Sequence, residues 1–477
     1  MTATSSPLPA TGPPQSAPPT LARALGLLAA TAIVVGDVIG TGVFLKAHVM
    51  TCNVGTPGLV IAVWIVGALL SLAGALTYAE LAVLWPYAGG EYVFVREAYG
   101  PLWGFLYGWT RFFVASTGGM AGLAAGFAIF LNVVSGGALQ ARPLLLPLVA
   151  SAAIVIVTLV NCAAVQVGGR IASAMAALKV GIVAGVGVGA FLLARGDWGH
   201  FAMSASGAAC EGVGAAARGG IAGFGAAMMG AMWSYNGWNE VTYIAGEVRN
   251  PDRNLPRAIV VGLGIIATLY ILVNVAYFYV LSPGAIADVL GSSAVATEVV
   301  TQFLGPRSAG FMAAALAMAV FGSLQVVTLV SARIPYAMAC DGIFFRRLAR
   351  LSPRTRVPVT ALVVQAGWAV ILVFSGSYDA LTDYAIFAVL IFVALSTASV
   401  FVFRRRMPDA PRAYRTIGYP IVPIVFLIVA AWLIVNTFVA TPGRALAGVG
   451  LMLAGLPFYW YWSRQSQSRQ ATRAPTV

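Results

Sequence analysis

Charged side chains are scarce in this sequence. Only 9% of the 477 residues are charged, whereas a typical soluble domain has about 25%. Histidine is limited to His48 and His200, and the sequence contains no metal-ligand cluster, nucleophile elbow or phosphate-binding loop. These absences argue against a soluble protein and against an enzyme. The sequence predicts neither a metal site nor a cofactor.

Cysteine is also rare. Cys52, Cys162, Cys210 and Cys340 have neither the paired spacing of metal ligands nor an evident disulfide framework. We interpret all four as small apolar residues. Nucleic acid is not an expected partner, because basic residues are not interleaved with the aromatic residues on which single-stranded bases stack.

Long hydrophobic runs are what the sequence has in abundance. Hydrophobic residues make up 60% of the chain, and the mean hydropathy is +0.88. Several nearly uncharged runs reach the roughly 20 residues that cross about 30 Å of hydrocarbon as a helix. The sequence therefore predicts an all-α polytopic membrane protein in a lipid bilayer. Twelve transmembrane helices are expected, at residues 24–50, 57–83, 101–134, 144–165, 170–194, 219–247, 257–281, 308–339, 358–376, 380–403, 418–440 and 445–463.

Basic residues are distributed unequally over the loops between these spans. If the N-terminus is cytoplasmic, that face carries 19 of the 28 basic residues and the opposite face carries six; Arg111, Lys179 and Arg333 lie within spans. Cytoplasmic loops of membrane proteins are enriched in lysine and arginine. We therefore expect a multi-pass protein of the plasma (inner) membrane with both termini cytoplasmic. The net charge of +13 then reflects mostly loop arginines that face anionic headgroups.

Two hydrophobic segments are interrupted by polar and glycine residues. Residues 23–50 are interrupted at 37–42, and residues 219–247 are interrupted at 235–239. Irregular backbone at membrane depth is tolerated only where it is buried in protein or lines a wet cavity, because lipid offers no hydrogen-bond partners. Two such breaks in corresponding halves of a chain indicate the substrate site of a transporter.

Each of these broken segments opens a unit of five spans. An odd number of spans per unit turns the second unit upside down, so the sequence predicts a five-plus-five inverted repeat with a site near the bilayer midplane. The expected organisation is a disordered cytoplasmic tail at 1–22, rich in proline, serine and threonine, a first repeat at 23–194, an extracytoplasmic loop at 195–218, a second repeat at 219–403, spans 11 and 12 with their preceding basic loop at 404–463, and a cytoplasmic tail at 464–477.

Four stretches of the chain resemble a known family. They are VGDVIGTGVF at 35–44, YAELAVLWPYAGGEYVFVREAYGP at 78–101, MWSYNGWNEVTYIAGEVRNPDRNLPRAI at 232–259 and SARIPYAMACDGIF at 331–344. In this order they are similar to the amino acid–polyamine–organocation (APC) superfamily, and the third is especially similar to its L-type amino acid transporter branch. The resemblance implies a LeuT-like fold with discontinuous first and sixth helices.

The first break has the chemistry of a carboxylate site independently of that resemblance. If the helix unwinds at Ile39 and Gly40, the amides of Thr41 and Gly42 open a second half-helix, whose positive end attracts an anion. The Thr41 hydroxyl can add a further donor. The alternative is that this stretch is only a kink or a packing face of small residues.

Further contacts with the substrate are implied by the resemblance. The carbonyl of Val38 and carbonyls near Trp233 and Asn236 would receive the ammonium group of an amino acid, with Ser234 and Tyr235 in the same break. Trp233 corresponds to an aromatic gate over the bound substrate; its alternative role is ordinary packing.

Side-chain selectivity is expected to depend on the third span. There Ala115 and Gly119 correspond to pocket positions, and both are small. They leave room for a medium-to-large neutral side chain.

Ionisable residues within the spans carry the remaining predictions. An unpaired Lys179 would cost roughly 2.5 to 3.5 kcal/mol, so it needs oxygen partners. The resemblance implies that its ammonium replaces a sodium ion between the broken first helix and the eighth; the alternative is a lysine that snorkels to the surface.

Asp37 is interpreted as an ion-pair partner of Lys179 or Arg111, a proton-coupling group or a ligand contact. Glu240 is interpreted as a helix cap rather than a gate, and Arg111 as a partner of Asp37 or an interfacial residue. A further set is expected to form ion pairs that close the cytoplasmic side: Glu80, Glu91, Glu247 and Arg333.

The expected function is secondary-active, sodium-independent transport of neutral L-amino acids by alternating access, either as an exchanger or as a proton symporter. The alternatives are a carrier of cationic amino acids or polyamines with the same fold, and a membrane sensor that binds amino acids without moving them. Loop 135–143 lacks cysteine. The disulfide to a heavy-chain partner that the resemblance suggests for animal L-type carriers is therefore not expected there.

Overall fold

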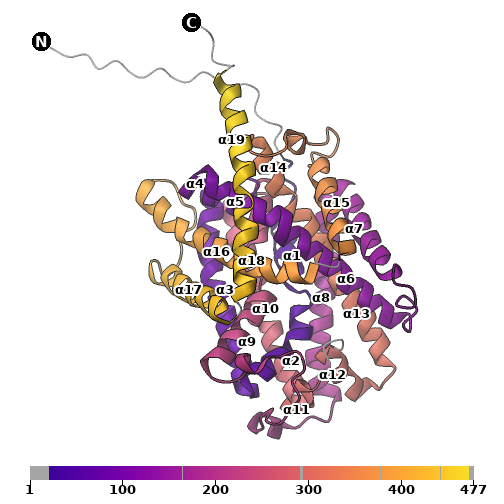
Figure 1. Ribbon diagram of the computed structural model, residues 1–477. Helices are drawn as coiled ribbons and strands as arrows, with labels where there is room; N and C mark the ends of the chain where they lie inside the picture. Colours follow the sequence, from indigo (N-terminus) through magenta and orange to yellow (C-terminus); the bar gives the residue numbers. More distant parts are fainter. Residues whose placement is uncertain (1–20, 164, 290–293, 376–377, 441, 472–477) are drawn as a thin grey trace, which may run out of the picture.

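The computed structural model describes residues 21–163, 165–289, 294–375, 378–440 and 442–471, and most of these residues are helical (Figure 1). The first half contains α1 (Leu27–Val38), α2 (Gly42–Val54), α3 (Pro57–Leu84), α4 (Glu91–Tyr99), α5 (Pro101–Thr110), the π-helix η1 (Arg111–Ser116), α6 (Thr117–Val134), α7 (Leu145–Ala163) and α8 (Val165–Leu193). The second half contains the short helices η2 (Trp198–Ala202) and η3 (Ala215–Ala217), then α9 (Gly220–Ser234), η4 (Glu240–Glu247), α10 (Pro251–Val280), α11 (Pro283–Ala287), α12 (Val295–Leu304), α13 (Ser308–Ser331), α14 (Arg333–Cys340), η5 (Arg346–Ala349), α15 (Val359–Ser375), α16 (Tyr378–Arg406), α17 (Ile421–Ala440), α18 (Pro442–Leu453) and α19 (Leu456–Ala471).

Both predicted breaks are present in the helices. Helices α1 and α2 meet at an angle of 41°, because the backbone of Ile39 leaves helical geometry at φ −73° and ψ 86°. Helix α9 ends at Ser234, and η4 begins only at Glu240. Between them Gly237 has a φ of +114°, a conformation that only glycine adopts readily.

Not all of the twelve predicted spans correspond to a helix long enough to cross a membrane. Nine helical segments in the described part of the chain are long and apolar enough to cross a membrane, and the bent pair α1–α2 makes a tenth. The predicted spans 219–247 and 358–376 correspond to α9 with η4 and to α15, which fall short of that length. Twelve spans therefore remain a prediction. The predicted tail at 1–22 lies outside the described residues except for residues 21 and 22, and α19 continues past 463 to Ala471.

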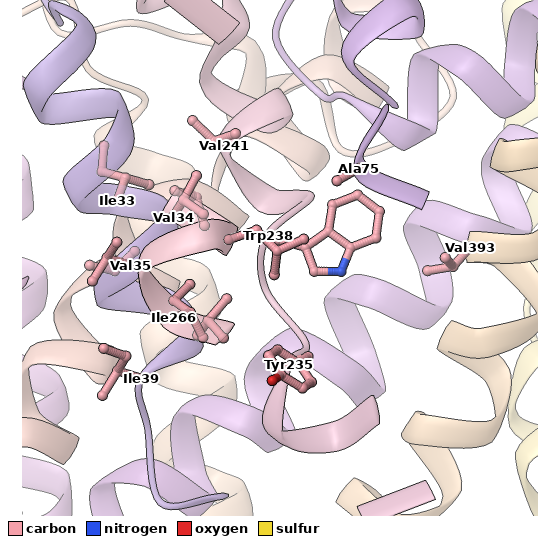
Figure 2. Close-up of a cluster of buried hydrophobic side chains, with 14 of the residues drawn as sticks. Ile33, Val34, Val35, Ile39, Ala75, Tyr235, Trp238, Val241, Ile266 and Val393 are labelled. Atoms are coloured by element: carbon pink, nitrogen blue, oxygen red, sulfur yellow. The ribbon is translucent and has the colours of Figure 1, made fainter. Parts of the chain in front are cut away.

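Helix α1 lies at the centre of the packing. Residues Ala32–Val38 are all buried, and α1 contacts α8, α10 and α13. A Cβ on Gly262 of α10 would lie 2.7 Å from the Val34 side chain, so glycine permits the close approach of these two helices. Figure 2 shows the apolar side chains of α1 and Ile266 of α10 beside Tyr235 and Trp238 from the second break. This core holds the ends of the broken helices in place.

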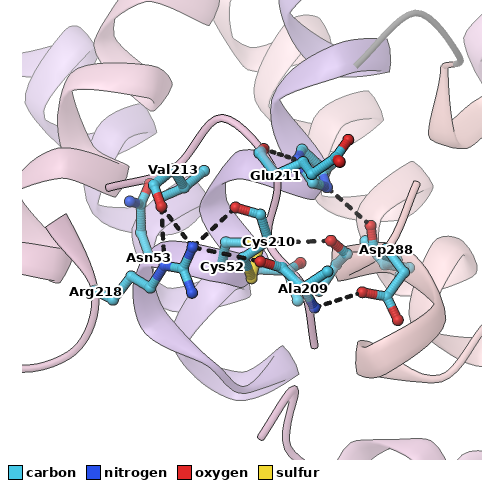
Figure 3. The surroundings of a disulfide bond; sticks show 12 residues. Cys52, Asn53, Ala209, Cys210, Glu211, Val213, Arg218 and Asp288 are labelled. Atoms are coloured by element: carbon cyan, nitrogen blue, oxygen red, sulfur yellow. Dashed lines mark hydrogen bonds between the residues drawn. A yellow bond between two sulfur atoms is a disulfide. The ribbon is translucent and has the colours of Figure 1, made fainter. Parts of the chain in front are cut away.

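A disulfide bond joins Cys52, near the end of α2, to Cys210 (Figure 3). The interpretation of all four cysteines as simple apolar residues was therefore wrong for this pair, while Cys162 and Cys340 are free. The two paired residues are 158 positions apart, so only the fold brings them together. Arg218 donates to the carbonyl of Val213 at 2.6 Å, which helps to hold the loop that carries Cys210.

Candidate substrate site

The two breaks face each other across a very short gap. A Cβ on Gly42 would lie 2.5 Å from the hydroxyl oxygen of Ser234, so only glycine fits at position 42. The Tyr270 hydroxyl from α10 lies 2.9 Å from the carbonyl of Val38 and 3.1 Å from that of Ser234. A hydroxyl has one proton, so Tyr270 can donate to only one of these carbonyls at a time. Tyr270 is a site residue that the sequence reasoning missed.

A cavity of about 280 Å³ lies between the breaks. This volume is close to the lower end of the range for small-molecule sites, about 300–1,000 Å³. Most of the residues predicted for the site line it: Asp37, Val38, Gly40, Thr41, Gly42, Arg111, Ala115, Gly119, Trp233, Ser234, Asn236 and Glu240. The geometry therefore gathers residues from three separate stretches of the sequence around one space.

Three predicted site residues do not line the cavity. Ile39 and Tyr235 are fully buried in the apolar core and are not part of the cavity lining, so their assignment as substrate contacts stays a prediction. The Tyr235 hydroxyl instead donates to the carbonyl of Trp64 at 3.2 Å. The composition of a break does not reveal which of its residues line the cavity. Lys179 also lies behind the cavity wall.

One wall of the cavity is apolar. Its hydrophobic side chains come from α6, α9, α13 and α16, and the sequence reasoning named none of them: Leu123, Met229, Met232, Val327, Val389, Leu390 and Val393. A surface of this composition favours an apolar side chain over a polar one.

The cavity is also lined by the residues at the start of α2. Thr41 is the N-cap of α2 and Gly42 is its first residue. The first N–H groups of a helix have no partner inside that helix, and those of Thr41 and Gly42 bond to none of the described residues. The carbonyl of Val38 stands at the end of α1, on the other side of the break. This carbonyl also accepts a hydrogen bond from the amide of Gly40 at 2.8 Å. The first break thus has donors at the start of α2 that are unpaired among the described residues, and an acceptor at the end of α1.

Arg111 and Glu240 form a buried ion pair beside the cavity, and their side chains are 4% and 7% exposed. Arg111 also donates to the hydroxyl of Tyr243. It belongs to the π-helix η1, a type of distortion that is frequent at functional sites. Arg111 is therefore neither a partner of Asp37 nor an interfacial residue, and Glu240 is an ion-pair partner as well as the first residue of η4.

Asp37 lacks an ion-pair partner within 4 Å among the described residues, so the predicted ion pair with Lys179 or Arg111 is not formed. It lies in the last turn of α1, is 9% exposed and lines the cavity. Its Oδ2 atom is buried without a hydrogen bond to any described residue.

Lys179 bonds to oxygens of α1 and α13 instead of to a carboxylate. Its Nζ atom donates to the carbonyl of Gly36 at 2.5 Å and to the hydroxyl of Ser323 at 2.6 Å. Ser323 in turn lies 3.2 Å from the carbonyl of Ile39. Lys179 is fully buried, so it does not snorkel to a surface. The ammonium therefore connects α8 to α1 and to α13, and α13 corresponds to the eighth predicted span.

Several contacts connect the helices on the side of the molecule that carries the arginine-rich loops. The amide of Leu25 donates to the carbonyl of Glu247 at 3.0 Å, so the start of α1 is tied to the end of η4. Arg333 holds the Glu247 carboxylate through two bonds, of 2.7 and 3.0 Å. Glu80 pairs with Arg404 at 2.7 Å.

Glu91 does not form the ion pair that we predicted within the described part of the chain. It instead accepts hydrogen bonds from the hydroxyls of Tyr78, Tyr107 and Tyr243, the latter two at 2.6 and 2.8 Å.

Comparison with known proteins assigns the family. The model of the amino acid permease family matches residues 25–461, almost the whole described chain. The chain is an amino acid permease. It belongs to the APC superfamily and its L-type branch, as the sequence motifs predicted. Membership of this superfamily is consistent with the predicted LeuT-like fold.

Three relatives illustrate what this permease is similar to. It is 30% identical to the b(0,+)-type amino acid transporter 1 of Mus musculus, over 92% of this chain and 88% of the relative. It is 29% identical to the serine/threonine exchanger SteT of Bacillus subtilis (strain 168), over 94% and 98%. It is also 29% identical to the large neutral amino acids transporter small subunit 2 of Homo sapiens, over 93% and 82%. These relatives are transporters, and this permease is an amino acid permease or exchanger.

Proposed function

We propose that this permease moves neutral L-amino acids across the plasma membrane by alternating access, without sodium. The observation that carries the proposal is the arrangement at the first break. Free amides of Thr41 and Gly42 begin one half-helix, and the carbonyl of Val38 ends the other. An amino acid carboxylate fits the positive helix end, and its ammonium fits the carbonyls. A decarboxylated amine would leave the amides without a partner.

The preference for neutral side chains is supported by the apolar wall. A cationic side chain would lie against Leu390 and Val393 and lose hydration there. One observation favours cationic amino acids as a second candidate, namely the unpaired carboxylate of Asp37 at the edge of the same cavity. Sodium independence is supported by Lys179, whose ammonium occupies the oxygen ligands between α1 and α13 that a cation would otherwise need.

The proposed orientation has both termini in the cytoplasm. The excess of arginine on one face supports it, and so does the disulfide at the opposite end of the molecule, since disulfides persist in oxidising compartments. In Figure 1, α4 and α14 lie at the upper end, whereas α2, α11 and α12 lie at the lower end.

The test is uptake into proteoliposomes that contain the purified permease. Labelled amino acids with neutral, cationic and anionic side chains are compared with matching amines, each with and without sodium and with and without amino acid inside. We expect uptake of neutral amino acids that internal amino acid stimulates and that sodium does not change. Uptake that requires sodium would contradict the proposal, and so would amines that compete as well as amino acids. Binding without any uptake would indicate a sensor.

A further inference from the structure

Buried carboxyl groups outnumber buried cations beside the cavity. Three carboxyl groups, those of Asp37, Glu240 and Glu91, share this region with two cations, Arg111 and Lys179; all five are at least nine-tenths buried. Arg111 serves two of the carboxyls, because it pairs with Glu240 and bonds to Tyr243, which donates to Glu91. If every group were ionised, the cluster would carry one net negative charge. An uncompensated charge at this depth is costly.

The position of Asp37 makes it the group least suited to remain a carboxylate. It lies in the last turn of α1, where the negative end of the helix dipole disfavours an anion. Glu240 is better placed to remain a carboxylate, because it lies at the positive start of η4 and pairs with Arg111. The charged groups that act on Asp37 from neighbouring elements are Glu240 of η4, Lys179 of α8 and Arg111 of η1.

The other groups around Asp37 are uncharged, so they cannot compensate the charge of its carboxylate. Helices α13 and α10 present Ser323 and the Tyr270 hydroxyl to the first break. A Cβ on Gly237 would lie 2.9 Å from the Asp37 carboxyl group, so the second break packs its glycine backbone against this side chain. The Oδ2 atom of Asp37 and the Oε2 atom of Glu240 are both without a partner among the described residues. Both residues line the cavity, so two buried carboxyl groups lie beside the proposed substrate.

We propose that Asp37, beside Glu240, is a proton-binding site that is filled when the permease carries a neutral amino acid inward. The proton comes from the external solution and binds a carboxylate oxygen of Asp37, which becomes a neutral carboxylic acid. It leaves for the cytoplasm after the amino acid, and the carboxylate is restored. This proposal rests on the proposed function, because it adds a proton to the transport of the same substrate class. It also makes the net movement of a neutral amino acid dependent on a pH gradient.

The test uses proteoliposomes without internal amino acid, in which only a gradient can drive accumulation. When the external solution is one pH unit more acidic than the vesicle interior, we expect labelled leucine to accumulate up to about tenfold. The reason is that the inward movement of one proton releases about 1.4 kcal/mol per pH unit. A protonophore should abolish the accumulation. Counterflow, measured in vesicles preloaded with leucine, reports separately whether the protein moves amino acids at all.

Variants then assign the site to Asp37. Asp37→Asn should lose the response to the gradient, whereas Asp252→Asn, the same substitution at an exposed position, should retain it. Normal wild-type counterflow without gradient-driven accumulation would overturn the proton site and leave the proposed function intact. A gradient response that survives in Asp37→Asn would also overturn it. Absence of counterflow in the wild type would overturn the proposed function itself.

A conservative variant covers the case in which Asp37→Asn does not fold. Asp37→Glu keeps a carboxyl group but moves it by one methylene, so the pH at which accumulation is half-maximal should shift. A retained response with a shifted midpoint supports the proton site. An unchanged midpoint overturns it.

Discussion

Thr41 is the residue at which the proposed carboxylate contact can be tested most directly. Its hydroxyl and amide line the cavity at the start of α2. Thr41→Ala removes one hydrogen bond to a charged group, worth about 1.5 kcal/mol, so half-saturating concentrations should rise about tenfold. Because every amino acid has a carboxylate, the effect should be similar for all substrates.

The measurement for Thr41 is concentration-dependent uptake of several amino acids. Thr268→Ala is the matched control, since Thr268 is exposed on α10 and its hydroxyl, among the described residues, bonds only to the carbonyl of Gly264 in its own helix. A change in the preference among side chains, rather than a uniform loss, would place Thr41 at the other end of the substrate.

Lys179 gives a second prediction at the residue scale. Lys179→Ala removes the ammonium that holds Gly36 and Ser323 together, and it leaves their buried oxygens without that donor. We expect transport to fall about tenfold or more, because bonds to a charged group contribute about 1.5–3 kcal/mol. Added sodium should not restore it.

The comparison variant Lys179→Met retains the length of the side chain and separates the charge from packing. Uptake of each variant is measured with and without sodium. Near-normal uptake in either variant would show that the bridge is not needed for transport.

At the scale of the element, half-helix α2 is fixed at both ends. Its start contacts the second break through Gly42 and Ser234, and its end is joined to loop 195–218 by the disulfide. Asn53 adds a bond of 2.7 Å to the carbonyl of Ala217. This arrangement predicts that α2 and the loop move together when the outer side opens and closes.

Removal of the disulfide should destabilise the protein measurably. Disulfides typically contribute about 2–4 kcal/mol, mainly by restricting the unfolded chain. The double variant Cys52→Ser with Cys210→Ser should therefore have a lower apparent melting temperature in detergent, as should the reduced wild type. Cys162→Ser is the control at a free cysteine. If the melting temperature is unaffected after reduction is verified by mass, the bond does not stabilise the fold.

The elements also show what the sequence could predict. Both breaks were predictable, because glycine and polar residues interrupt apolar runs at 37–42 and 235–239. The π-helix η1 was not, because its altered hydrogen bonding has no distinctive composition. Tyr270 was not either, since a tyrosine in an apolar span does not reveal which carbonyls it will meet.

On the scale of the whole molecule, the charge distribution and the disulfide support the same orientation. Cys340 provides an independent test, because it is free, exposed and located at the end of α14, close to the arginine-rich loop that begins at Arg346. With Cys162 replaced by serine, Cys340 is the only remaining free thiol.

We expect a membrane-impermeant maleimide at pH 8 to leave Cys340 unmodified in right-side-out vesicles and to modify it in inside-out vesicles. Mass spectrometry of the labelled peptide verifies that Cys340 is the modified residue. Labelling of Cys340 from the outside would reverse the orientation, and the proton that we assign to inward transport would then have to enter from the cytoplasm.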